Sequence, residues 1–223
     1  MASLFFLCQI LLTFVCFNAK DMKIPKDSAI VVVDMLYDFI DGSMACAHAE
    51  PAVTKALELL QQNAEATADG DVQEIIQAGG SVPVLFVCDS HPADHCSFTE
   101  QGGPWPPHCV SGTRGAEIHD ALKPFADEAC IFRKGCDKAL EQYSGFEGRN
   151  AAGQSLAEVL EILDAQSVLV VGIATEYCVR NTAEDLLKAG FPVTVLEDAL
   201  AYVDYQGHLE ALDAMKKENI QIR

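Results

Sequence analysis

Hydrophobic residues along the chain alternate between short continuous runs and longer stretches of helical periodicity. Apolar residues spaced three and four apart predict helices over about 53–78, 155–165, 176–190 and 206–219. Continuous apolar runs occupy 29–35, 82–90, 130–135, 167–175 and 192–200. Such runs are typical of strands covered on both faces. The alternation predicts an α/β fold with three layers: a doubly wound, mainly parallel sheet with helices on both faces.

Polar side chains follow the predicted strands directly. Asp34, Asp89 and Lys134 lie at the ends of three strands, and the 172–178 turn follows the fourth. In open parallel sheets the ligand site lies beyond the carboxyl ends of the strands. We therefore expect these residues to meet at one edge of the sheet.

Cys178 lies at the predicted start of a helix, just after a strand. Amide groups at a helix N-terminus stabilise a thiolate and lower the pKa of the thiol, which favours a nucleophile. A small buried hydrophobic residue is the alternative interpretation. Asp34 could take the thiol proton, and the ammonium of Lys134 would favour the thiolate. The combination favours a cysteine nucleophile.

A second group of polar residues has the composition of a metal site. Its side chains suit Zn²⁺, Fe²⁺ or Mn²⁺, and open coordination positions would admit a substrate. A polar loop with incidental histidines is one alternative, and a structural zinc site that includes Cys96 and Cys109 is another. Three candidate ligands come from the segment DSHPADH and the fourth from a later loop: Asp89, His91, His95 and His108.

That later loop, GPWPPHCVSGT at 103–113, contains the only tryptophan of the chain, Trp105. Its three prolines exclude a helix interior or a central strand, and they stiffen the segment. The loop is either an ordered surface turn or a support that aims Trp105 and His108 at fixed points.

Composition excludes several classes of function. The formal net charge of −18 and the scattered basic residues argue against binding to nucleic acid or to an anionic membrane. The charge suits a neutral or cationic small substrate better. Nine cysteines without a CxxC pair exclude a zinc ribbon and a thioredoxin motif. Their odd number indicates free thiols in a reducing compartment.

The N-terminus, in contrast, has a feature of secreted proteins. The apolar run Leu4–Phe17 has the length of a signal-peptide core, but no basic residue precedes it. A signal peptide and an uncleaved extension over 1–20 are both open, and in either case we expect one domain over 21–223.

Several motifs then carry a resemblance that spans about 29–204. They are VVVDMLYDF, DSHPADHCSF, WPPHCVSGTRGAEI, FRKGCDKALEQYSGFEG and VVGIATEYCVRNTAEDLLKAGF. In these motifs and in their order the chain resembles the nicotinamidases (pyrazinamidases) of the isochorismatase-like cysteine hydrolase family. DSHPADH and KGCDKALEQY differ in length from some bacterial members.

The resemblance implies a role for each candidate residue. It implies a metal-dependent hydrolysis of nicotinamide, and of pyrazinamide, through a Cys178 thioester with Asp34 as acid and base. It also implies a cis peptide between Ile173 and Ala174, whose amide would form an oxyanion hole with that of Cys178. The implied sets are a catalytic triad, Asp34, Lys134 and Cys178; metal ligands, Asp89, His91, His95 and His108; and substrate-binding aromatics, Phe39, Trp105 and Tyr143.

Two rival functions remain open at this point. One is another isochorismatase-like hydrolase, either an isochorismatase or an N-carbamoyl amidohydrolase, and the other is a non-catalytic binding protein on the same fold.

We expect one divalent ion, with zinc favoured over iron or manganese, and nicotinamide as the small-molecule partner. The resemblance also implies a cytoplasmic protein that forms a homo-oligomer, whereas the apolar Leu4–Phe17 segment allows a secretory route.

Overall fold

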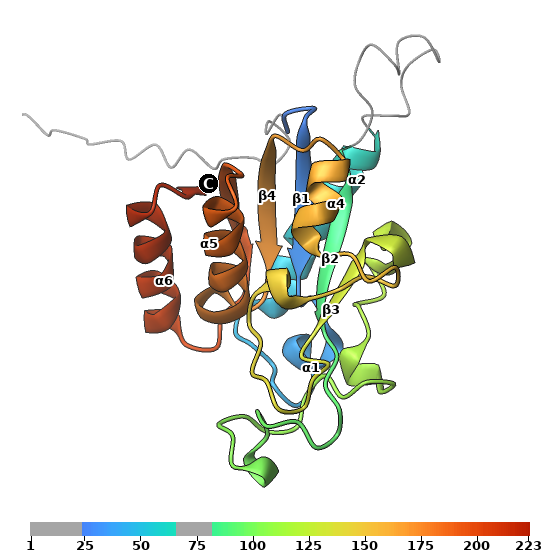
Figure 1. The fold of residues 1–223 in the computed structure, drawn as a ribbon. Helices are drawn as coiled ribbons and strands as arrows, with labels where there is room; N and C mark the ends of the chain where they lie inside the picture. The colour runs from blue at the N-terminus through green and yellow to red at the C-terminus, as the bar shows by residue number, and fades with distance from the viewer. Residues whose placement is uncertain (1–23, 66–81) are drawn as a thin grey trace, which may run out of the picture.

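A parallel sheet is the centre of the computed structural model, which describes residues 24–65 and 82–223 (Figure 1). Six strands of these ranges join in the order β3-β2-β1-β4-β5-β6, and every neighbouring pair is parallel. The predicted fold class is therefore confirmed. The strands are β1 Ser28–Val33, β2 Val84–Asp89, β3 Ile131–Lys134, β4 Ser167–Gly172, β5 Val193–Leu200 and β6 Gln221–Ile222.

Helices cover both faces of this sheet (Figure 1). Side chains alternate between the two faces of a strand, so each buried strand contributes to both apolar layers. In β1, Ile30 and Val32 pack with α2, whereas Ala29, Val31 and Val33 pack with the helices of the opposite face. The α-helices are α1 Tyr37–Ile40, α2 Ala49–Glu65, α4 Leu156–Ile162, α5 Arg180–Lys188 and α6 Tyr205–Lys217.

Shorter turns connect these elements. Thr175–Val179 forms a π-helical turn that leads directly into α5. The 3₁₀ turns are η2 Thr99–Gln101, η3 Arg114–Ala116, η4 Lys123–Phe125, η5 Glu128–Cys130 and η6 Gly145–Glu147.

Several boundaries differ from the predicted ones for local reasons. The first strand ends at Val33 because Asp34 has a φ of 49° and turns the chain out of the sheet. α2 begins at Ala49, before Pro51, since a proline in the first turn of a helix removes no helical hydrogen bond. The predicted continuation of that helix over 66–78 lies outside the described residues. The final IQI segment pairs with β5 as the short strand β6.

The carboxyl ends of β1 to β4 point to one end of the sheet, where α1 and the long connecting loops gather (Figure 1). This is the edge at which the sequence predicts the site. Among the described residues no helix is both long enough and apolar enough to span a membrane. The predicted extension over 1–20 lies outside the described residues.

Candidate active site and metal centre

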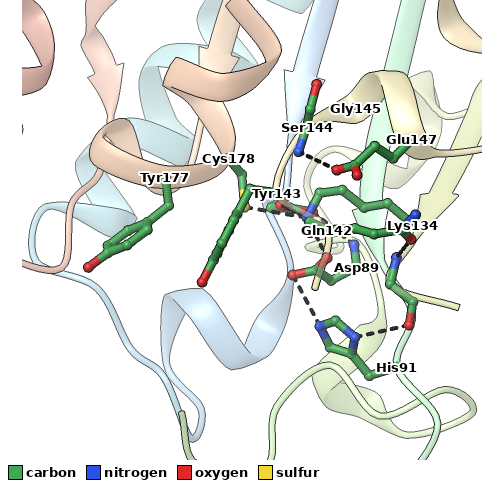
Figure 2. Close-up of polar contacts among 12 residues, drawn as sticks. Asp89, His91, Lys134, Gln142, Tyr143, Ser144, Gly145, Glu147, Tyr177 and Cys178 are labelled. Atoms are coloured by element: carbon green, nitrogen blue, oxygen red, sulfur yellow. Dashed lines mark hydrogen bonds and ion pairs between the residues drawn. The ribbon is translucent and has the colours of Figure 1, made fainter. Parts of the chain in front are cut away.

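Lys134 is the centre of a buried polar cluster at the ends of four neighbouring strands. It is the last residue of β3, and its side chain is fully buried. Its Nζ lies 3.0 Å from Oδ2 of Asp34 and 3.3 Å from Sγ of Cys178. It also forms an ion pair with Oδ1 of Asp89 (Figure 2). The predicted triad is thus brought together, because β3, β2, β1 and β4 are adjacent in the sheet.

Asp34 is a fully buried carboxylate directly after β1. Its Oδ1 accepts a 2.8 Å hydrogen bond from the backbone N–H of Asp89. Oδ2 makes no other hydrogen bond with the described residues beyond the ion pair with Lys134. Burial, followed by the charge of Asp89, raises the pKa of Asp34 to about 6, although Lys134 opposes this shift. Asp34 is therefore ionised at neutral pH and can accept a proton.

Cys178 lies inside the π-helical turn, and only 6% of its surface is exposed. Burial raises the pKa of its thiol well above the ordinary range, although Lys134 opposes the shift. The prediction of a lowered thiol pKa is therefore wrong, because desolvation of the thiolate outweighs the helix terminus and the ammonium. The thiol needs a base to lose its proton, and a carboxylate oxygen of Asp34 lies within 4.8 Å of Sγ.

Three of the four predicted metal ligands converge beside this cluster. Asp89, His91 and His108 are all buried, and each offers one ligand atom within 4.8 Å of the others. His91 donates from Nδ1 to the carbonyl of Gly135 over 3.1 Å, and His108 donates from Nδ1 to that of Pro106 over 2.8 Å. These bonds direct each Nε2 away from the backbone, where it can serve as a ligand atom, and Nε2 of His91 faces Oδ2 of Asp89 at 3.5 Å (Figure 2). The donor set therefore fits a divalent cation.

His95 does not join this trio. Its Nε2 donates to the carbonyl of Leu140 over 3.0 Å, and its Nδ1 accepts from the backbone N–H of Ser97 over 3.2 Å. Both ring nitrogens are thus engaged with the backbone, and the structure does not bring His95 into the ligand cluster, so its role as a metal ligand stays a prediction. Its ring instead packs beside that of His91, with centroids 4.2 Å apart, and anchors the loop that precedes Tyr143. The length of the DSHPADH segment, which differs from that of some bacterial members, was the available signal of this difference.

The alternative zinc site with two cysteines is not formed in the described residues. Cys109 is fully buried in the apolar core on the α2 side of the sheet. Cys96 is not part of a ligand cluster, and its backbone N–H donates to the carbonyl of Lys138 over 2.8 Å.

The proline-rich loop is fastened to the segment that carries His91. The N–H of Trp105 donates to the carbonyl of Ser97 over 3.0 Å, and its carbonyl accepts from Thr99 over 2.7 Å. Farther along, the N–H of His91 donates to the carbonyl of Cys109 over 2.9 Å. Two backbone connections thus flank His108, and the stiff loop holds both Trp105 and His108 at the site rather than forming a detached surface turn.

A narrow pocket with a cavity volume of about 30 Å³ lies over Cys178 and the candidate ligand trio. Phe39, Trp105 and Tyr143, the three predicted aromatic residues, all line it. Trp105 donates from Nε1 to the hydroxyl of Tyr143 over 3.2 Å, and this bond joins two walls that come from different loops. Ala174 and Cys178 line the pocket as well, and the peptide between Ile173 and Ala174 is cis.

Comparison with known proteins assigns the chain to a family. A model of the Isochorismatase domain matches residues 28–222. The chain belongs to the isochorismatase family. The nicotinamidase/pyrazinamidase of Mycobacterium tuberculosis is 34% identical over 197 residues, which cover 87% of this chain and 97% of that protein.

Solved structures of isochorismatase-family hydrolases agree with this assignment. The pyrazinamidase of Pyrococcus horikoshii in complex with zinc has a TM-score of 0.72 and 35% identity, and the match covers 88% of this chain and 98% of that one. PnC1 of L. infantum in complex with nicotinate has a TM-score of 0.71 and 30% identity, with coverage of 91% and 95%. The recognition from sequence is therefore confirmed.

Sequence reasoning missed several residues that line this isochorismatase-family pocket. Tyr177 lies beside Tyr143 in Figure 2, with ring centroids 5.7 Å apart, and packs edge-on against Trp105 at 5.2 Å. Its position next to Cys178 was the available signal. The others are supplied by loops whose proximity depends on the fold: Met44, Cys46, Glu141, Gln142 and Val203.

Proposed function

We propose that this chain hydrolyses nicotinamide to nicotinate and ammonia, and that it accepts pyrazinamide as well. The observation that carries the proposal is that one aromatic-lined pocket contains both Cys178 and a metal-ligand trio. A buried thiol with a neighbouring base supports covalent amide hydrolysis, and the trio supports recognition of a ligand with a nitrogen lone pair. The relatives named nicotinamidase or pyrazinamidase support the same substrate class.

The first step is proton transfer from Cys178 to Asp34. The ionised carboxylate receives the thiol proton while Lys134, 3.3 Å from Sγ, stabilises the thiolate as it forms. Sγ then bonds to the carbonyl carbon of the amide. The carbonyl oxygen becomes an oxyanion, which the backbone N–H groups of Ala174 and Cys178 would stabilise.

The second half of the reaction reuses Asp34. The proton that it received passes to the amide nitrogen as the carbon–nitrogen bond breaks, so ammonia leaves and an acyl thioester remains on Cys178. Asp34 then takes a proton from water, the hydroxide adds to the thioester carbon, and the carbon–sulfur bond breaks as Asp34 returns the proton to Sγ. Nicotinate is released and the thiol is regenerated.

The residues that would hold a metal ion are Asp89, His91 and His108. A divalent cation bound there, zinc being the favoured one, supplies a Lewis-acid coordination position for the ring nitrogen of the substrate. Asp89 also pairs with Lys134, so the same carboxylate connects the ligand trio to the triad. Phe39, Trp105 and Tyr143 would enclose the ring and exclude water from it.

Ammonia release from nicotinamide by the purified protein tests the proposal, with and without a chelator and with Cys178→Ala in parallel. We expect activity that is lost in Cys178→Ala and after chelation, and restored by added zinc. Absence of ammonia from reduced, metal-loaded protein would overturn the assignment, and isochorismate and N-carbamoyl compounds would then be the substrates to assay. Substantial turnover by Cys178→Ala would overturn the covalent route.

A further inference from the structure

Glu176 connects the nucleophile turn to the chain segment before α6. It lies in the turn Thr175–Val179, two residues before Cys178. Its Oε1 accepts two hydrogen bonds of 2.8 Å, one from the backbone N–H of Val203 and one from that of Asp204. A carboxylate that accepts from two amides forms charge-assisted bonds, which are stronger than bonds between neutral groups. No step of the proposed mechanism uses this side chain.

The segment that Glu176 holds forms one side of the pocket. Val203 lines the pocket together with Met44 and Cys46, and we call these three residues the apolar wall. The two segments of the wall are joined at Ala47 and Tyr202, whose backbones exchange hydrogen bonds of 2.8 and 3.1 Å. The position of Val203 relative to Cys178 therefore sets the width of the pocket on this side.

Other contacts hold the near end of this segment but not Val203. The N–H and hydroxyl of Thr175 donate to the carbonyl of Ala201 over 2.9 and 3.0 Å, and His208 donates from Nδ1 to that hydroxyl over 2.9 Å. Val203 itself is 43% exposed, so packing constrains it weakly. Its backbone is fixed chiefly by the bond to Glu176.

We propose that Glu176 is a positioning residue that sets the distance between the nucleophile turn and the apolar wall, and thereby the affinity for the substrate ring. The inference rests on the proposed amide hydrolysis. The length of the side chain is the important property, since a shorter carboxylate would draw the wall toward the turn or lose its bonds. A side chain of equal length with one acceptor oxygen would preserve the spacing.

Trp105 provides a direct measure of ligand binding. It is the only tryptophan of the chain and lines the pocket, so its fluorescence should change when nicotinamide binds. In a Cys178→Ala background, which does not turn over, we expect Glu176→Ala and Glu176→Asp to raise the Kd for nicotinamide about tenfold. Glu176→Gln should stay within about threefold of the parent protein, because its amide oxygen still accepts from both N–H groups.

Steady-state ammonia release with Cys178 intact separates positioning from folding. We expect the KM of Glu176→Asp to rise about tenfold while kcat changes by less than about threefold, with little change for Glu176→Gln. Glu210→Ala is the matched control, because Glu210 is exposed on α6 and, within the described residues, its side chain accepts a hydrogen bond from Gln206 alone. Should Glu176→Ala fail to fold, the Asp and Gln variants decide the question.

Two results would overturn the role of Glu176 while leaving the proposed function intact. One is a wild-type KM in the Glu176→Asp variant, measured beside active wild-type protein, even if the melting temperature of the variant falls. The other is a Glu176→Gln variant as impaired as Glu176→Asp, which would make charge rather than length the determinant. A wild-type protein that releases no ammonia would instead overturn the proposed function.

Discussion

Replacement of Gly135 by alanine should remove His91 from the metal centre. Gly135 follows β3 with a φ of +67°, and its carbonyl accepts the Nδ1–H of His91. An added Cβ would lie 2.3 Å from Cε1 and 2.4 Å from Nδ1 of that ring. Carbon atoms in contact are separated by roughly 3.5–4.0 Å, so the ring must move by about 1 Å. Metal sites tolerate ligand displacements of only about 0.2 Å.

The expected loss follows from that displacement. Disturbing the group that orients a metal-binding histidine typically lowers metal affinity by about 10- to 100-fold, and a shift of the ligand itself adds to this. The variant also places a Cβ in the left-handed region of φ, which costs about 1–2 kcal/mol of unfolding free energy. Zinc affinity, measured by competition with a chromophoric chelator, should therefore fall at least about tenfold, and ammonia release at low zinc should fall with it.

Gly153→Ala is the matched control for backbone strain. Gly153 has a φ of +80°, and an added Cβ there has no neighbouring atom within 4 Å. This variant should also lose about 1–2 kcal/mol of unfolding free energy, because the backbone strain is similar. It should nevertheless bind zinc like the wild-type protein. Wild-type zinc affinity in folded Gly135→Ala would refute the reasoning, because it would mean that His91 is not a ligand or that the loop yields without moving it.

Three further predictions concern charges and ligands at the same site. The kcat/KM for nicotinamide should rise with pH through about 6 and then level off, because only ionised Asp34 accepts the thiol proton. The profile is measured from about pH 4.5 to about pH 8 at saturating zinc. A flat profile down to the lowest pH would exclude Asp34 as the base. In metal analysis the His95→Asn variant should retain zinc, because His95 contacts backbone groups. The His108→Asn variant should lose zinc, because His108 lies in the ligand trio. Equal losses of zinc in the two variants would support His95 as a ligand. Lys134→Met should lower the unfolding free energy in urea at neutral pH by about 3–5 kcal/mol, because two buried carboxylates lose their counter-ion. That loss should shrink as the pH falls and Asp34 binds a proton. The exposed pair of Lys188 and Asp185 is the control, and an equal loss in Lys188→Met would contradict the assignment.

The order of strands and helices could be predicted because burial imposes a period on the sequence. A strand covered on both faces must be apolar throughout, and this condition identified β1, β2 and β4 to within a few residues. The triad could be predicted for a related reason, because parallel strands present all their carboxyl ends at one edge. Asp34, Lys134 and Cys178 needed only to follow strands in the same part of the sheet in order to meet.

The ligand set and the pKa of the thiol could not be predicted from the sequence, because both depend on distances between loops. The residue types of the DSHPADH segment do not distinguish His91 from His95, and only the backbone partners around each ring decide which one faces the trio. The thiol of Cys178 illustrates the same limit. A helix terminus is visible in a sequence, but the depth of burial that raises the pKa of the thiol depends on how the whole edge of the sheet is covered.

The sequence by itself therefore determined the fold class, the family and the chemistry available at the sheet edge, because each depends on local periodicity or on short motifs. Only the tertiary structure decided which side chains share the pocket and in which protonation state. Val203 joins Met44 in the pocket wall because β5 returns the chain to that edge more than 150 residues later. Desolvation, ligand distance and pocket width are properties of packing between distant segments, and a one-dimensional pattern does not contain them.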